Sequence, residues 1–205
     1  AKKRADKESN MNKQFVLSPQ PTTKRRADIE GPDFYPTPSW ATYALIENEK
    51  FSGDIWESAC GDGAMSTVLE TLGVPVRSSD LFDRGYGEAG IDFTASSARH
   101  SNVITNPPYN LAEEFVAAGL KTANKKFALL LRLAFLEGAA RQKKIFSRTP
   151  PSRVWVFSER ITFYPKNVER KGSGTTAYAW FVWDKDSSSP TQLSWLPTGI
   201  KKRYS

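Results

Sequence analysis

The chain has 205 residues, of which 39% are hydrophobic and 25% are charged, and it contains six tryptophans. This is enough apolar material for one folded domain with its own core, and no apolar run is long enough to cross a membrane. The single cysteine, Cys60, and the single histidine, His100, leave no disulfide framework, no zinc cluster and no His-based triad. Metal hydrolases and serine hydrolases are therefore poor candidates.

Basic and acidic residues are unevenly distributed along the chain. The net charge of +7 divides into +4 over residues 1–30, −5 over 31–142 and +8 over 143–205. An acidic middle flanked by basic ends is typical of proteins that bind polyanions, and it favours nucleic acid as a partner. A surface that serves solubility, or a basic tail without a partner, is the alternative.

The two ends of the chain differ in composition from the middle. Residues 1–30 are rich in charge, Gln, Ser and Pro and lack apolar periodicity, which predicts a flexible basic arm. Their charge without an apolar core behind it indicates no secretory signal, and one cysteine fits a reducing cytoplasm. We expect this arm, a folded domain over 31–190 and a basic carboxyl-terminal tail over 191–205.

Strand and helix patterns alternate through the folded domain. Ser39 is expected to cap a first helix that runs through Ile46. The further expected strands are 53–57, 74–79, 102–105, 127–133 and 153–157, and the expected helices between them are 64–72, 111–123 and 136–146. The segments 161–163 and 177–183 are expected to pair as a long-looped hairpin. This order predicts an α/β fold with a Rossmann-like, mostly parallel sheet, helices on both faces and a terminal antiparallel hairpin.

A short motif follows the apolar run 103–105 at the expected carboxyl end of a strand: Asn106, Pro107, Pro108 and Tyr109. Both prolines have a fixed φ and no N–H to donate, so the motif is rigid and rich in acceptors. The Asn side-chain oxygen and the carbonyls can converge on a planar amino group, and the Tyr ring can stack on the ring that carries it. The motif indicates a reaction at an exocyclic amine, although ordinary turn punctuation before a helix is the alternative.

Residues at other strand ends suit a cofactor that contains adenosine. Gly61 and Gly63 allow a tight turn and a close approach of the ligand to the backbone. Asp80 ends the next strand, where a carboxylate can accept the hydroxyls of a ribose. Asp92 and Phe93 offer an acceptor for an adenine amino group and an apolar wall. Each pattern taken singly is also typical of a plain helix entry or cap.

Charge at the glycine turn separates two kinds of cofactor. A dinucleotide fingerprint needs a third glycine where this chain has Ser66, and it places a pyrophosphate at the turn. Glu57 and Asp62 would repel a pyrophosphate but attract a cationic sulfonium. We therefore expect S-adenosylmethionine (SAM) and not a nicotinamide dinucleotide.

Over residues 34–185 the chain resembles the SAM-dependent DNA adenine-N6 methyltransferases, in the gamma-like order that sets cofactor motifs before the catalytic motif. Ser58 stands where the family commonly has Pro, and no room remains for a large target-recognition domain. The chain is therefore most similar to the compact orphan enzymes of phages and mobile elements. The cofactor-binding residues that the resemblance implies are Tyr35, Thr37, Glu57, Ala59, Gly61, Gly63, Asp80, Asp92 and Phe93.

The resemblance also implies a class I methyltransferase sheet, methyl transfer from SAM to the N6 amino group of adenine in DNA, and catalysis by residues 106–109. It requires no metal, and it places the protein in a cytoplasm, that of a bacterial host if a phage or mobile element encodes it. Clustered cations are the candidates for contact with phosphates. They are Lys143, Lys144, Arg148, Lys166, Arg170 and Lys171.

Three other functions remain open from the sequence. The same motif is similar to that of RNA amino-methyltransferases acting on adenine or guanine, and the basic ends do not separate RNA from DNA. It is also similar to that of enzymes that methylate protein glutamine, which the basic ends disfavour. A methyltransferase fold can also persist as a catalytically inactive nucleic-acid-binding protein.

Overall fold

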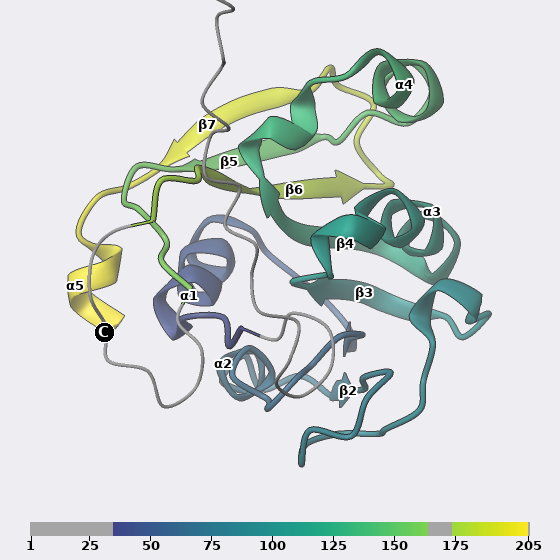
Figure 1. Ribbon diagram of the computed structural model, residues 1–205, viewed down its shortest axis with the longest axis vertical. Coiled ribbons are helices and arrows are strands. Elements are labelled where there is room, and N and C mark those ends of the chain that lie inside the picture. Colours follow the sequence, from purple (N-terminus) through teal and green to yellow (C-terminus); the bar gives the residue numbers. More distant parts are fainter. Residues whose placement is uncertain (1–34, 164–173, 205) are drawn as a thin grey trace, which may run out of the picture. The chain divides into compact units, whose positions relative to one another are not determined.

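The computed structural model describes residues 35–163 and 174–204, and it contains a seven-stranded sheet in the order β2-β1-β3-β4-β6-β5-β7 (Figure 1). Six strands run in the same direction, and β6 is antiparallel to both of its neighbours. The strands are β1 (Ile55–Glu57), β2 (Val76–Ser78), β3 (His100–Thr105), β4 (Ala123–Arg132), β5 (Arg153–Phe157), β6 (Tyr178–Asp184) and β7 (Gln192–Leu196).

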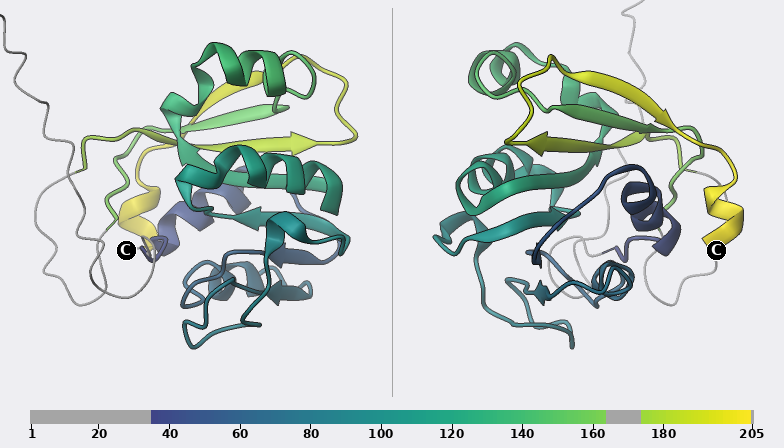
Figure 2. Two further views of the ribbon diagram at one scale, coloured as in Figure 1. Left: turned by 45° about the vertical axis from the view of Figure 1, so that its right-hand side comes forward. Right: turned by 180° about the vertical axis from the view of Figure 1, so that it is seen from behind.

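Helices cover both faces of the sheet (Figure 2). The α-helices are α1 (Ser39–Asn48), α2 (Ser66–Glu70), α3 (Ala112–Thr122), α4 (Ala139–Arg141) and α5 (Ile200–Tyr204). Shorter turns are the 3-10 helices η1 (Phe93–Ala95), η2 (Tyr109–Leu111) and η3 (Leu133–Leu136) and the π-helix η4 (Gln142–Phe146). Side chains of α1, α2 and α5 belong to one apolar cluster, and those of α3 and η4 belong to the other.

The central strand β4 shows why the sheet lies between two cores. Residues 127–131 are all apolar and at most 1% exposed. Ala128 and Leu130 belong to the cluster of α1, whereas Leu129 and Leu131 belong to the cluster of α3. This alternation is the period-2 geometry of a strand that is buried on both faces. The predicted fold class, a mostly parallel sheet with helices on both faces, is confirmed.

The predicted terminal hairpin is wrong in its partners. Segment 161–163 forms no strand, and β6 pairs instead with β5, with Trp155 opposite Trp180. Ile161 is nonetheless only 1% exposed, so its apolar character reflects core packing and not strand pairing. Segment 161–163 was predicted as a strand because its apolar residues, which are needed for core packing, resemble a short strand pattern.

The carboxyl-terminal segment, predicted as a separate tail, forms strand β7 of the sheet and helix α5. Strand β7 pairs in parallel with β5, and Leu196 and Ile200 are buried. The α5 residue Tyr204 stacks on Tyr43 of α1 with ring centroids 3.9 Å apart. The sequence concealed this strand because Leu193 and Trp195 remain 47% and 66% exposed.

Two details at helix ends also differ from expectation. Pro38 occupies the N-cap position of α1, and the Ser39 hydroxyl donates instead to the Tyr204 carbonyl at 2.9 Å. The helix expected over 136–146 is divided among η3, α4 and η4, with Gly138 at a φ of 114° between them. Among residues 35–163 and 174–204, no helix has the length and apolarity that a membrane span needs.

The parallel arrangement brings four strand ends to one edge of the sheet. The chain leaves β1 toward the glycine loop, β2 toward Asp80, β3 toward Asn106 and β4 toward Leu133. Because these strands are parallel neighbours, the segments that follow them share this carboxyl edge. The candidate site is built there.

Candidate active site

The loop after β1 is shaped by two glycines and an aspartate. Gly61 and Gly63 have φ values of 57° and 85°, a region that favours glycine. The Gly61 N–H donates to Asp80 Oδ2 at 2.9 Å, so the ends of β1 and β2 are joined. A Cβ added to Gly63 would lie 2.6 Å from the Tyr86 ring, so a larger residue at that position would require the ring to move.

Acidic groups gather beneath this loop. Glu57 is 2% exposed, and its carboxylate accepts a hydrogen bond from the Ser66 hydroxyl, which also contacts the Ser78 hydroxyl at 2.6 Å. Burial raises the pKa of Glu57 well above its usual value, and the charges of Asp80 and Asp62 raise it further. A cation bound near this cluster would relieve that repulsion.

Cys60 lies in the same loop and is not a candidate nucleophile. Burial, followed by the charges of Glu57 and Asp80, raises the pKa of its thiol to about 12. A thiol with this pKa carries almost no thiolate at neutral pH. With 4% of its surface exposed, Cys60 packs as a small apolar side chain.

The carboxylate of Asp80 stabilises the start of the loop that follows β2. Its Oδ1 accepts the Phe82 N–H at 2.9 Å, and its Oδ2 accepts that of Gly61. Each carboxylate oxygen has a second lone pair, so hydrogen-bonding capacity for a ligand remains. The adjoining Leu81 and Phe82 are 50% and 42% exposed, and neither was predicted from the sequence as a site residue. Their signal was an apolar pair at the start of an otherwise polar loop.

Asp92 and Phe93 differ in solvent exposure, although they are neighbours in the chain. Asp92 is exposed and caps η1, and the hydrogen bonds that it accepts from Thr94 lower its pKa. Phe93 is 2% exposed and packs edge-on against Trp56 with centroids 5.1 Å apart. Phe93 is therefore a core residue that anchors the loop carrying Asp92, whereas we expected it to form an open wall.

The amide of Asn106 joins the catalytic motif to the amino-terminal cofactor motif, residues 35–38, whose Tyr35 and Thr37 the resemblance assigns to the cofactor. Its Nδ2 donates to the Thr37 hydroxyl at 3.1 Å across 69 residues of sequence. Thr37 is 7% exposed, and Tyr35 is half-buried nearby in sequence. The Asn106 Oδ1 is buried and accepts no hydrogen bond from the residues that the structure describes. An unsatisfied buried acceptor costs about 1–3 kcal/mol, so its retention points to a function.

The rest of the motif forms a shelf beside Asn106. Pro107 is buried, and Pro108 is exposed and precedes η2, in which Tyr109 is the first residue. The Tyr109 ring lies 5.7 Å from that of Tyr178, and the Arg132 guanidinium carbon lies 5.0 Å from the Tyr109 centroid. Arg132 was also not singled out from the sequence, where its signal was a lone charge at the end of a buried apolar strand.

The expected phosphate contacts are divided between described and undescribed residues. Lys143 and Lys144 lie on the exposed side of η4, and the Lys144 amine is 3.6 Å from a Glu113 carboxylate oxygen. Arg148 is exposed just beyond η4. The other three candidates, Lys166, Arg170 and Lys171, lie outside the described residues. Within the described ranges, no three His, Cys, Asp or Glu side chains gather as metal ligands would.

No protein-family model and no curated protein matches this chain. Solved structures do match, at low sequence identity. Thermoplasma acidophilum protein 1320 has a TM-score of 0.51 at 15% identity, over 71% of this chain and 88% of its own. Atu636 from Agrobacterium tumefaciens, described as a predicted O-methyltransferase, also has a TM-score of 0.51 at 15% identity, over 77% and 84%.

A dimethyladenosine transferase from Plasmodium falciparum has a TM-score of 0.50 at 14% identity, over 74% of this chain and 62% of its own. These matches, together with the strand order, show that the chain has the Rossmann-like methyltransferase fold. Identities of this size show the fold alone, and the reaction must be inferred from the site.

Proposed function

We propose that this protein transfers a methyl group from SAM to the N6 amino group of adenine in DNA. The observation that carries the proposal is the amide of Asn106: Thr37 holds its nitrogen, and its buried oxygen accepts no hydrogen bond from the described residues. An acceptor of this kind, followed by Pro107, Pro108 and Tyr109, suits the amino group of a planar base.

The residues of the glycine loop fit the proposed cofactor. SAM supplies a methyl group on a positively charged sulfur. Asp62 and Asp80 provide a negative field for such a cation, and a bound cation would favour the ionised form of the buried Glu57, which burial disfavours. Asp80 retains lone pairs for ribose hydroxyls, and exposed Asp92 is available to the adenine amine. Tyr35, Thr37 and Ala59 complete the proposed cofactor contacts.

The acceptors of the motif act on the nucleophile. The lone pair of an aromatic amine is delocalised into the ring, which makes the amine a weak nucleophile. Hydrogen bonds from the amine to Asn106 Oδ1 and to the Pro107 carbonyl favour a pyramidal nitrogen with its lone pair directed toward the methyl group. No strong base is needed, because the proton becomes acidic when the nitrogen is methylated. Positioning and desolvation of this kind supply on the order of several kcal/mol.

The substrate must displace part of the protein to reach this acceptor. Because Asn106 Oδ1 is shielded from solvent, an incoming amine contacts it only if neighbouring chain moves aside. Tyr109 would stack on the base, which must leave a duplex at a cost of a few kcal/mol. Cations at Lys143, Lys144 and Arg148, and at Lys166, Arg170 and Lys171 in the undescribed segment, are proposed to offset this cost by binding phosphates.

Parallel methyl-transfer assays test the proposal. The protein is incubated with tritiated SAM and, separately, with DNA, RNA and a protein mixture, and the labelled product is hydrolysed and identified. We expect N6-methyladenine in DNA and far less of it with Asn106→Ala. Transfer of tritium to RNA or protein but not to DNA would contradict the proposal that DNA is the substrate. Calorimetry that detects no binding of SAM would contradict the cofactor and favour an inactive nucleic-acid-binding protein.

A further inference from the structure

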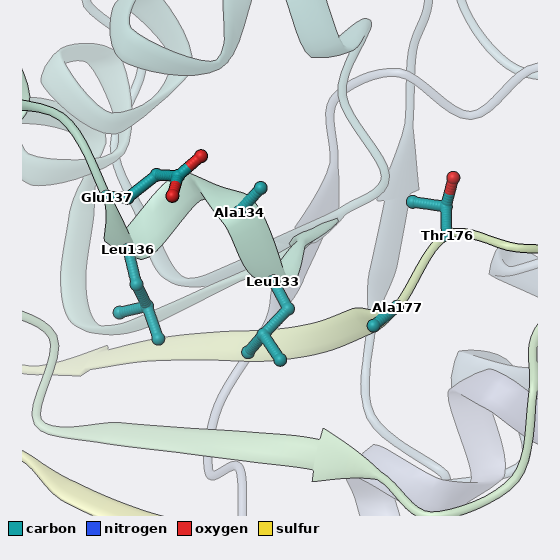
Figure 3. A pocket seen from close by; sticks show the side chains of 6 residues that line it. All are labelled: Leu133, Ala134, Leu136, Glu137, Thr176 and Ala177. Atoms are coloured by element: carbon teal, nitrogen blue, oxygen red, sulfur yellow. The ribbon is translucent and has the colours of Figure 1, made fainter. Parts of the chain in front are cut away.

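A shallow apolar groove of about 580 Å³ lies at the carboxyl edge of the sheet, just beyond the shelf that carries Tyr109. It is formed where β4 turns into η3 and where the chain enters β6 (Figure 3). Its lining residues are Leu133, Ala134, Leu136, Glu137, Thr176 and Ala177.

Strand pairing places this groove next to Arg132, which contacts the catalytic shelf. Arg132 lies opposite Tyr178 in the register of β4 and β6, and the Leu133 N–H donates to the Ala177 carbonyl at 2.8 Å. Arg132 also lies over the Tyr109 ring, with its guanidinium carbon 5.0 Å from the centroid. The shelf, Arg132 and the groove therefore follow one another along the same edge.

The groove has an apolar floor and one charged side chain. Leu133 and Leu136 provide flat apolar surface, and Leu136 is 38% exposed. Glu137 is exposed at the rim, and its carboxylate makes no hydrogen bond or ion pair within the described residues. An apolar surface with a carboxylate beside it can hold a flat ring that carries an amino group.

Resting on the proposed function, we propose that this groove binds the base adjacent to the target adenine and selects one with an exocyclic amino group, that is adenine, cytosine or guanine, over thymine. The leucines contact the face of that base, and the Glu137 carboxylate accepts its amino N–H. The exposed guanidinium of Arg132 binds the phosphate between the two nucleotides. A nucleotide chain presents a base, a phosphate and a second base in the same order as the shelf, Arg132 and the groove.

This assignment gives a source of sequence preference to a chain without a large target-recognition domain. A carboxylate accepts from the amino group of adenine, cytosine or guanine, but thymine has carbonyl oxygens and no amino group. A phosphate contact positions the strand without reading its sequence. Glu137 is therefore the residue that discriminates between flanking bases, and Arg132 only positions the strand.

Single-stranded oligonucleotides with one adenine, flanked on each side by cytosine, guanine or thymine in turn, test this assignment. The rate of tritium transfer from SAM is measured for the wild type, Glu137→Gln, Arg132→Gln and the control Asp186→Asn. Asp186 is an exposed acid just beyond β6, at the opposite edge of the sheet. The wild type and Asp186→Asn should prefer an amino-bearing base at one flanking position by about tenfold.

Glu137→Gln should lose this preference, because an amide can donate to a carbonyl as well as accept from an amine. Arg132→Gln should slow transfer to every oligonucleotide by a similar factor and keep the preference. A wild-type profile that does not depend on the flanking base, or a preference that survives in Glu137→Gln, overturns the assignment. A wild type that methylates none of the oligonucleotides, while DNA and RNA also remain unlabelled in the assay above, refutes the proposed function and the groove assignment with it.

Discussion

The two edges of the sheet use buried polar groups in opposite ways. At the amino edge of the parallel strands, the 5%-exposed Glu49 accepts hydrogen bonds from Arg153 and from the Trp155 indole, and Lys126 adds a salt bridge. At the carboxyl edge, the Asn106 Oδ1 is buried without a hydrogen-bond partner among the described residues. The first arrangement holds the fold together, and the second keeps hydrogen-bonding capacity in reserve for a substrate.

Other groups extend this contrast. Asp54 at the amino edge accepts from the Ser101 backbone and hydroxyl and contacts His100 Nδ1 at 2.6 Å. At the carboxyl edge, the hydroxyls of Ser58 and Thr105 are buried and, within the described chain, unsatisfied. One amino-edge atom departs from the pattern, the Asn102 Oδ1, although its Nδ2 donates to two carbonyls. The comparison predicts that substitutions at one edge change stability and substitutions at the other change activity.

The largest effect is expected from Asn106→Ala. Methyl transfer should fall by a factor of about 10²–10³, the usual cost of losing one oriented hydrogen-bonding group at a reacting centre. The melting temperature should change little, because the substitution removes an unsatisfied buried oxygen together with the hydrogen bond to Thr37. Asn124→Ala, at an exposed position near the start of β4, is the matched control and should leave activity unchanged. Loss of folding without a specific loss of activity would refute the contrast between the edges.

Glu49→Ala should do the reverse. It removes one partner from a nearly buried network and leaves Arg153 with only the Asp184 carboxylate, at 2.8 Å. The free energy of unfolding should fall by about 3 kcal/mol, as for other broken buried ion pairs. Urea denaturation measures this loss, and activity per folded molecule should be close to that of the wild type. A large drop in kcat with unchanged stability would contradict a structural role.

A smaller and pH-dependent effect is expected from Asp54→Asn. Burial raises the pKa of Asp54, but hydrogen bonds from Ser101 and His100 outweigh burial and hold it at about 2. A lowered pKa stabilises the folded state above the ordinary value of 3.8, and this stability is lost as the pH falls through 2. Because the side chain is 38% exposed, the contribution is about 1 kcal/mol after allowance for solvent screening.

The free energies of unfolding of wild type and Asp54→Asn, measured by urea titration between pH 7 and pH 2, check this prediction. Asp54→Asn should be the less stable at pH 7, and the two should converge near pH 2. A difference that stays constant with pH would show that the ionised carboxylate is not the stabilising species.

An effect on stability of opposite sign is expected from Glu57→Gln. The raised pKa of Glu57 means that the unfolded chain ionises first as the pH rises above about 4.5, so the folded state loses relative stability. Glutamine cannot ionise in either state and can still accept the Ser66 hydroxyl. The variant should therefore gain stability relative to wild type between pH 4 and pH 8, and it should bind SAM more weakly. Parallel pH dependences of stability would contradict burial of an ionisable group.

The position of the candidate site at the carboxyl edge of the sheet was predictable from the sequence, because polar residues and glycines follow the predicted strands. A parallel sheet brings its strand ends together, so residues 57, 80 and 106 could be assigned to one site before their contacts were known. The Thr37–Asn106 hydrogen bond joins two motifs that the sequence had linked only by resemblance. Phe93 was assigned to an open wall because an aromatic ring looks alike in sequence whether it lines a pocket or fills a core.

The misassigned elements depended on tertiary contacts. Segment 161–163 is apolar because Ile161 is buried, whereas β7 forms although two of its side chains are exposed. Burial and strand pairing, which usually coincide, are separate in these two segments. Arg132 gave no recognisable motif, since its position over Tyr109 results from the register of β4 beside β3.

The most direct test of the account compares Asn106→Asp with Asn106→Ala in single-turnover methyl transfer from tritiated SAM to DNA. Aspartate keeps an oxygen that can accept from the amine, and the Thr37 hydroxyl can donate to its other oxygen. We expect Asn106→Asp to transfer the methyl group faster than Asn106→Ala. Equal and complete loss in both, with SAM binding and folding intact, would contradict the claim that this oxygen receives the amine.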